Sequence, residues 1–133
     1  MIGIDADILL RILIQDDAAQ LDQVERQMAK AVAIGERVHI CLPVFSETVY
    51  VLLRIKKMPK AEICAAMRQV LDAAAFLIEQ GDALREALKM WEKGKAGFND
   101  YLIGSINHRL GCTITSTFDK ALLAEQPERY QSP

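Results

Sequence analysis

Short apolar runs alternate with longer stretches of helical period along this chain, and this alternation limits the possible folds more than any other feature. Apolar runs at 1–4, 38–42, 76–78 and 112–116 have the length of buried strands, and a segment of helical period follows each of them. Such alternation is typical of a parallel sheet covered by helices. The sequence therefore predicts an α/β fold with a mostly parallel sheet of four or five strands, the last one following Pro127.

The predicted helices begin and end at recognisable signals. We expect helices over 7–14, from 16 or 17 to about 35, 43–57, 59–74, 82–93 and 99–110, and a short helical turn over 120–125. The expected N-caps are Asp16 or Asp17, Asp82, Asn99 or Asp100, and Asp119. Short side chains with oxygen acceptors suit these places, because they accept hydrogen bonds from the free N–H groups of a first helical turn. The expected buried stripes are Leu21, Val24 and Met28 in one helix and Leu102, Ile103, Ile106 and Leu110 in another.

The composition indicates an ordinary globular protein. At 133 residues, of which 51% are apolar, we expect residues 1–133 to form one domain with its own core. The net charge of −2 means that a nucleic-acid partner would need a local basic patch. The longest apolar run, 73–78, is too short to span a membrane, so we expect a cytoplasmic protein. The residues Cys41, Cys64, Cys112, His39 and His108 form no zinc or disulfide pattern, and the cysteines are expected in the core.

Four acids occupy equivalent places relative to these elements. Asp5 follows the first strand and Asp119 follows the fourth. Glu47 lies one turn into the helix after the second strand, and Asp100 starts a helix. Because the carboxyl ends of parallel strands border one crevice, we expect these acids to converge there. Clustered carboxylates repel one another, and a hard cation such as Mg²⁺ or Mn²⁺, which prefers oxygen ligands, relieves that repulsion.

Each acid also has a purely structural interpretation. Asp100 and Asp119 are good helix caps, and Asp5 could be a solvated residue at a strand end. Glu47 is harder to explain in this way, because its helical neighbours are uncharged. Those neighbours, three and four positions away, are Pro43, Val44, Tyr50 and Val51. An acid on an apolar helix face is usually paired or bound to a metal ion.

Four stretches of the chain carry a resemblance to a known family. They are IDADILLRILIQDD at 4–17, LPVFSETVYVL at 42–52, FNDYLIGSINHRLGC at 98–112 and TSTFDKAL at 115–122. Together they resemble the PIN domains, and among these the VapC-type ribonuclease toxins of toxin–antitoxin pairs. The family's acids fall on Asp5, Glu47, Asp100 and Asp119. The resemblance implies an endoribonuclease that hydrolyses RNA phosphodiester bonds with one or two Mg²⁺ or Mn²⁺ ions.

The resemblance also implies roles for single residues. Asp5 and Asp100 are the expected direct ligands, Glu47 is the next candidate, and Asp119 would bind a second ion or its water. Two positions depart from the family pattern. Asp7 replaces an Asn, which adds a negative charge, and Gly97 replaces an acid, which predicts weaker binding of a second metal ion. Thr117 either donates its hydroxyl group to the phosphate or an acid, or caps the chain before Asp119.

A polyanionic substrate needs cations near the acids. The candidates for contacts with RNA phosphates are Arg11, Arg54, Lys56, Lys57, Lys93 and Lys95. A plain solvated helix face explains these charges equally well. Trp91 fits either a stacking contact with a base or the core, and the core is the commoner place for an aromatic residue beside Leu88.

The resemblance further implies a homodimer and a small antitoxin protein as partner. The apolar helices over 43–53 and 61–75 are the expected surfaces for such contacts. Two other functions remain open. One is a catalytically silent PIN fold that serves as a binding module. The other is a haloacid-dehalogenase-type phosphatase, which Ile8 and Leu9 after the second Asp disfavour.

Overall fold

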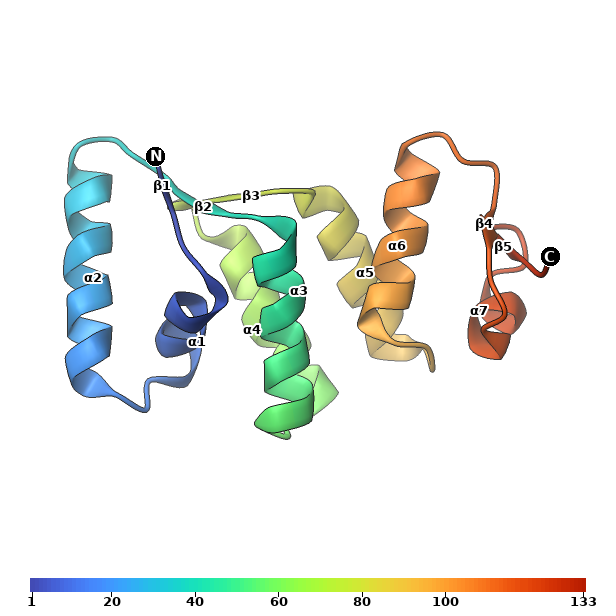
Figure 1. Cartoon of the computed structure of the whole chain (residues 1–133), viewed down its shortest axis with the longest axis horizontal. Helices are drawn as coiled ribbons and strands as arrows, with labels where there is room; N and C mark the ends of the chain where they lie inside the picture. The colour runs from blue at the N-terminus through green and yellow to red at the C-terminus, as the bar shows by residue number, and fades with distance from the viewer. The chain divides into compact units, whose positions relative to one another are not determined.

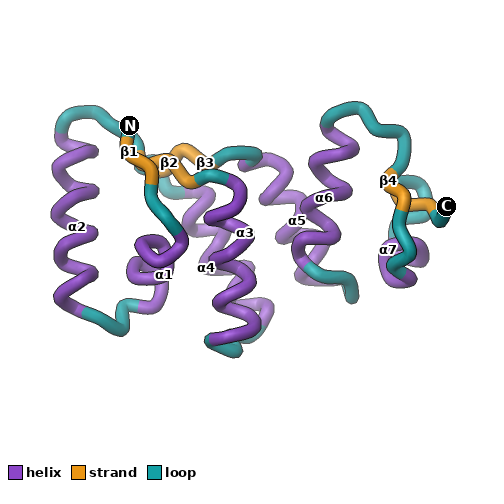
Figure 2. Tube along the Cα trace, in the orientation of Figure 1, coloured by secondary structure: helices purple, strands orange, loops and turns teal.

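The computed structural model describes residues 1–133, which divide into two compact units, Met1–Glu79 and Gln80–Pro133. The first unit contains β1 (Ile2–Gly3), α1 (Ala6–Ile14), α2 (Ala18–Ala33), β2 (Val38–Ile40), α3 (Leu42–Tyr50), the π-helical segment η1 (Val51–Ile55), α4 (Lys60–Asp72) and β3 (Phe76–Ile78) (Figure 1). The second unit contains α5 (Gly81–Lys93), α6 (Phe98–Arg109), β4 (Thr115–Ser116), α7 (Lys120–Glu125) and β5 (Tyr130–Gln131). Helix makes up most of both units (Figure 2).

The first unit is built around a three-stranded parallel sheet. Its strand order is β1-β2-β3, with Gly3 paired to His39 and Ile40 paired to Ile78. The central strand is the most buried, since Val38 and Ile40 have no exposed surface. Because the strands are parallel, the residues that follow β1, β2 and β3 share one edge of the sheet. The helices α1 and α3 both begin at this edge.

The second unit consists of the helix pair α5 and α6 and a small βαβ unit. The strands β4 and β5 pair in parallel, and α7 connects them. The predicted α/β class with parallel strands flanked by helices is therefore confirmed, including the final strand after Pro127. The five strands lie in a three-stranded and a two-stranded sheet, whereas the sequence predicted one sheet. No helix in either unit has both the length and the apolar character needed to cross a bilayer.

The predicted helix caps are correct for α2 and α7 and wrong for α5 and α6, since α6 has Gly97 as its N-cap in place of Asn99 or Asp100. Asp17 caps α2 by accepting a hydrogen bond from the backbone N–H of Gln20 at 3.0 Å, and Asp119 caps α7. The predicted cap Asp82 is wrong, because α5 already begins at Gly81 after Gln80, which adopts a left-handed conformation with φ 57°. Asp82 instead lies in the first turn of α5, where a negative charge interacts favourably with the helix dipole.

The buried face of α6 differs from the predicted stripe. Ile103 and Leu110 are 53% and 75% exposed, so two members of that stripe are wrong. The helix buries Phe98, Tyr101, Leu102 and Ser105, which follow the spacing i, i+3, i+4 and i+7. A serine is tolerated at this face because its Oγ donates a hydrogen bond to the carboxylate of Glu86 at 2.7 Å. The spacing of apolar residues alone therefore predicts the wrong buried face for α6.

Three further predictions need correction. The helix after β2 does not run regularly to Lys57, because α3 ends at Tyr50 and continues as the π-helical segment η1. Of the three cysteines only Cys64 is buried, whereas Cys41 is half-buried and Cys112 is exposed. In the predicted stripe of α2, Val24 is buried while its two partners are half-buried.

Glu86 on α5 is the centre of a charged network in the second unit. Its carboxylate binds the guanidinium groups of Arg129 and Arg109 and the hydroxyl of Ser105. Partial burial raises the pKa of Glu86, but the hydrogen bonds from Ser105 and Arg129 and the two positive charges lower it further, so the net pKa lies below its ordinary value of 4.5. The ionised form is therefore favoured by folding.

This network predicts a pH-dependent contribution to stability. A carboxylate with a lowered pKa stabilises the fold above its ordinary pKa, and the stabilisation is lost as pH falls through the lowered value. We expect Glu86→Gln to reduce the free energy of unfolding by roughly 1–3 kcal/mol at pH 7. The difference from the wild type should shrink below pH 4.5 in urea titrations. A difference that stays constant from pH 7 to pH 3 would contradict the assigned role of the charge.

Candidate functional site

Asp5 lies at the carboxyl end of β1 and caps α1. Its backbone is extended, and its Oδ1 accepts a hydrogen bond from the backbone N–H of Ile8 at 3.0 Å. The side chain is exposed, and its Oδ2 has no hydrogen-bond partner. Asp7, in the first turn of α1, is exposed and has no side-chain partner. Asp5 is thus held by one oxygen and can offer the other to a ligand.

Glu47 lies on the exposed side of α3. The expectation that it sits on an apolar face is wrong, because the buried face of α3 consists of Val44, Phe45, Thr48 and Val49. A polar residue belongs to that face because the Thr48 hydroxyl donates to the carbonyl of Val44 at 2.7 Å. Glu47 forms no hydrogen bond or ion pair, so both of its oxygens are free.

A further acid at this sheet edge, Glu79, was missed by the sequence reasoning. It follows β3 directly, and its Oε1 accepts a hydrogen bond from the backbone N–H of Leu42 at 2.7 Å. This bond supplies the cap that α3 otherwise lacks, because Cys41 makes no side-chain cap. Its position after the apolar run 76–78 was a usable signal, since Asp5 follows the first strand in the same way.

Asp100 lies in the first turn of α6, in the second unit. The helix begins at Phe98 with Gly97 as N-cap, one turn earlier than a cap at Asp100 would require. The Oδ2 of Asp100 accepts a hydrogen bond from the backbone N–H of Gly97 at 3.0 Å. A Cβ atom at Gly97 would lie 3.0 Å from this oxygen, so an acid at this position would require the Asp100 side chain to shift by a few tenths of an ångström. The other carboxylate oxygen of Asp100, Oδ1, has no hydrogen-bond partner.

Asp119 follows β4 and caps α7. Its Oδ1 accepts hydrogen bonds from the backbone N–H groups of Ala121 at 2.9 Å and Leu122 at 3.1 Å. The hydroxyl oxygen of Thr117 accepts a hydrogen bond from the backbone N–H of Asp119 at 3.0 Å. The structure thus shows the local capping contact that was one of the two interpretations of Thr117. The Oδ2 of Asp119 has no hydrogen-bond partner.

The donor chemistry of these acids fits a hard divalent cation. Asp5, Asp100 and Asp119 each have one oxygen fixed by backbone N–H groups at a helix start and one oxygen free. Carboxylate oxygens suit Mg²⁺ or Mn²⁺. The two histidines offer no alternative nitrogen ligands for a metal site, because half-buried His39 and exposed His108 do not lie beside a cluster of acids. Asp5 and Glu47 belong to the first unit, Asp100 and Asp119 to the second. Within either unit, no three His, Cys, Asp or Glu side chains lie close enough to hold a metal ion.

The positively charged candidates differ in how free they are. The Arg11 guanidinium binds the carboxylate of Asp16 at 2.5 Å and the side-chain oxygen of Gln20 at 2.5 Å, so its charge is partly neutralised. The side chains without ion pairs are Arg54, Lys56, Lys57, Lys93 and Lys95, all of them exposed. Trp91 is 3% exposed and packs edge to face on Phe98 with ring centroids 5.7 Å apart, which confirms the core interpretation.

Comparison with known families identifies the fold family of this chain. Residues 2–126 match the model of the PIN domain, which covers all four stretches and all four acids discussed above. A comparison with curated proteins finds no match. The family match extends over nearly the whole chain and agrees with its parallel strands flanked by helices. This chain therefore belongs to the PIN domain family.

Proposed function

We propose that this protein is a Mg²⁺- or Mn²⁺-dependent endoribonuclease. The family supports a nuclease, because PIN domains are commonly nucleases that use divalent metals. The observation that carries the proposal is the state of three acids. Asp5, Asp100 and Asp119 are each fixed through one oxygen at a helix start while the other oxygen stays free. A carboxylate held in this way loses little side-chain entropy when it binds a cation.

In this proposal Asp5, Asp100, Glu47 and Asp119 hold the ion or ions. When bound, a divalent ion supplies a Lewis acid for the scissile phosphate and an activated water at neutral pH. Asp5 and Asp100 orient one free oxygen each through their backbone contacts. Glu47 has no competing partner, so it is free to join them. Thr117 acts by fixing the backbone at Asp119, which keeps that carboxylate aligned with the start of α7.

The test is metal-dependent cleavage of RNA by the purified protein. We expect Mn²⁺ to support cutting inside an RNA chain, EDTA to stop it and Asp5→Ala to abolish it. Hydrolysis of a small phosphate ester should be absent, which separates a nuclease from a phosphatase. Cutting that survives both EDTA and Asp100→Ala would refute the proposed mechanism.

We further propose that the nuclease is the VapC-type toxin of a toxin–antitoxin pair, acting as a homodimer in the cytoplasm. The resemblance of the four stretches supports this role. Exposed apolar side chains on α3 and η1, Tyr50 at 58% and Ile55 at 62%, offer surface for a protein partner. Expression should arrest bacterial growth, and the product of a small adjacent reading frame should restore it. Light scattering that shows only monomers would exclude the dimer.

A catalytically silent PIN fold is the second candidate. Asp7 and Gly97, the two departures from the family pattern, favour it, because one adds charge near Asp5 and the other removes a ligand. This candidate predicts RNA binding without cleavage in Mn²⁺. The cleavage experiment above therefore distinguishes the two functions.

A further inference from the structure

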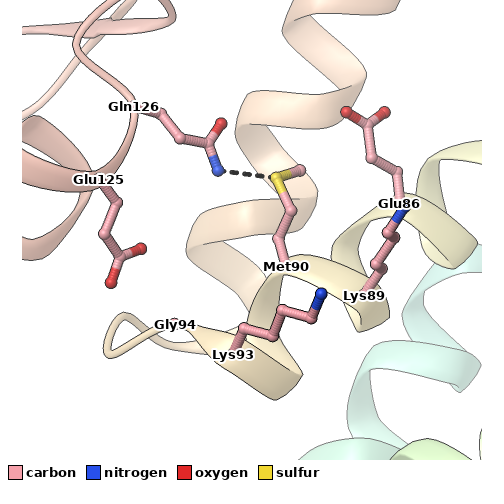
Figure 3. A pocket seen from close by; sticks show the side chains of 7 residues that line it. All are labelled: Glu86, Lys89, Met90, Lys93, Gly94, Glu125 and Gln126. Carbon is pink, nitrogen blue, oxygen red and sulfur yellow. Dashed lines mark hydrogen bonds between the residues drawn. The ribbon is translucent and has the colours of Figure 1, made fainter.

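The second unit contains a pocket of about 450 Å³ beside α5 and α7. Its lining residues are Glu86, Lys89, Met90, Lys93, Gly94, Glu125 and Gln126 (Figure 3). Met90 lies in its middle, where its sulfur accepts a hydrogen bond from the Gln126 side-chain amide at 2.8 Å. The pocket therefore combines an apolar floor with charged groups on its rim.

The acidic groups around this pocket have hydrogen-bond or ion-pair partners within the protein. Glu86 is neutralised by Arg109 and Arg129. Glu125 accepts hydrogen bonds from the Tyr101 hydroxyl at 2.5 Å and from the backbone N–H of Lys95 at 2.9 Å. Burial and the hydrogen bond to Glu125 raise the pKa of Tyr101 to about 12, so Tyr101 remains a donor at physiological pH.

Lys89 and Lys93, in contrast, form no ion pair. They are four residues apart on α5, which places them on one face of the helix. In Figure 3 the carboxylates of Glu86 and Glu125 point away from the two ammonium groups. With both acids engaged elsewhere, the rim presents two free positive charges at the edge of an apolar floor. Two positive charges beside an apolar surface attract an anion more strongly than the same charges fully surrounded by water.

The pocket is also connected to one of the proposed metal ligands. The loop 94–97 leaves α5 directly after Lys93 and ends at Gly97, whose backbone N–H holds the Asp100 carboxylate. Two hydrogen bonds fix this loop: the backbone N–H of Lys95 donates to the Glu125 carboxylate, and the backbone N–H of Ala96 donates to the Tyr101 hydroxyl at 3.2 Å. The lysine pair and Asp100 thus lie on the two sides of one well-anchored loop.

We propose that Lys89 and Lys93 bind a backbone phosphate of the RNA substrate. The proposal rests on the nuclease function and names the part of the substrate that this pocket takes. A phosphodiester fits because each linkage carries one negative charge, which two ammonium groups can share. The contact positions the strand and does not read its sequence.

The experiment is RNA binding in EDTA, where no cutting occurs. A fluorescently labelled single-stranded RNA is titrated with the protein at several KCl concentrations, and anisotropy is measured. We expect the variant with both Lys89→Ala and Lys93→Ala to bind on the order of tenfold more weakly at 0.1 M KCl and to lose about 1.4 from the slope of log K against log salt. Two single variants give a matched comparison. Lys93→Ala should lower the slope, whereas Lys30→Ala, which removes an exposed lysine on α2, should leave the slope at its wild-type value.

The controls separate this site from the nuclease function and from general anion binding. Thermal unfolding of each variant checks the fold, because Lys93 also lies in the last turn of α5, where a cation stabilises the helix. Replacing both lysines with arginine should restore the slope. An unchanged slope in the alanine variant of a protein that cuts RNA overturns the pocket and leaves the nuclease standing. A lost slope in a protein that never cuts RNA supports the pocket and rejects the nuclease. Equal competition by polyglutamate of matched charge overturns the assignment to RNA.

Discussion

Replacing Asp100 with asparagine is expected to lower Mn²⁺-dependent RNA cleavage by more than about 100-fold while leaving the stability of the protein almost unchanged. The side-chain oxygen of asparagine can still accept the hydrogen bond that Asp100 receives from Gly97, because Asn and Asp are similarly good acceptors at helix starts. The substitution therefore removes the charge and keeps the structural contact. Single-turnover cleavage and thermal unfolding measure the two effects separately.

Asp100→Ala is the matched comparison. It should reduce cleavage as strongly as Asp100→Asn and in addition cost about 1 kcal/mol of stability, because the contact with Gly97 is lost. Asp5→Asn and Asp119→Asn should show the same separation, since both residues cap helices through one oxygen. Calorimetric titration with Mn²⁺ gives a second readout that does not depend on cutting. If Asp100→Asn cuts RNA as fast as the wild type, the carboxylate has only its structural role.

Gly104→Ala on α6 is expected to destabilise the protein, although alanine normally favours a helix. A Cβ atom at this position would lie 1.7 Å from the Tyr130 hydroxyl oxygen and 2.4 Å from the ring carbon that carries it. Tyr130 is 1% exposed, and its hydroxyl donates to the backbone carbonyl of Asp100 at 3.4 Å, so the ring has little room to move. Overpacking of this kind costs roughly 1–3 kcal/mol, more than the gain of about 0.5–1 kcal/mol from replacing glycine in a helix. Urea unfolding measures the net loss.

Gly81→Ala is the control for this prediction. Gly81 begins α5, and a Cβ atom at this position would have no other atom within 4 Å, so alanine there should be neutral or stabilising. Combining Gly104→Ala with Tyr130→Ala should cost less than the sum of the single effects, because the second substitution removes the clash. A more stable Gly104→Ala protein would show that β5 does not pack on α6 through Tyr130.

The candidate site shows where sequence reasoning works and where it stops. The positions of Asp5 after β1 and Asp119 after β4 could be predicted, because strand ends and caps are encoded within a few residues. The family match covers both. The exposure of Glu47 could not be predicted, because its neighbours along α3 are uncharged whichever side of the helix is buried. Which of them turn inward depends on packing against residues far away in the chain.

Glu79 makes the same point from the other direction. Its contact with Leu42 joins residues 37 positions apart, and only the pairing of β2 with β3 brings them together. Local pattern rules carry no information about such a contact. The substitutions of Asp5, Asp100 and Asp119 described above test the proposed metal binding.

The sequence by itself determined the α/β class, the parallel strands and the PIN family, because apolar period and short motifs are local properties that survive without coordinates. The tertiary structure alone decided which faces are buried and which charges are free. Ser105 lies on the buried face of α6 because Glu86 accepts its hydrogen bond, and Lys89 and Lys93 do not pair with Glu86 or Glu125 because these two acids have other partners. Both outcomes depend on competition among side chains brought together by folding, and a linear pattern does not contain that competition.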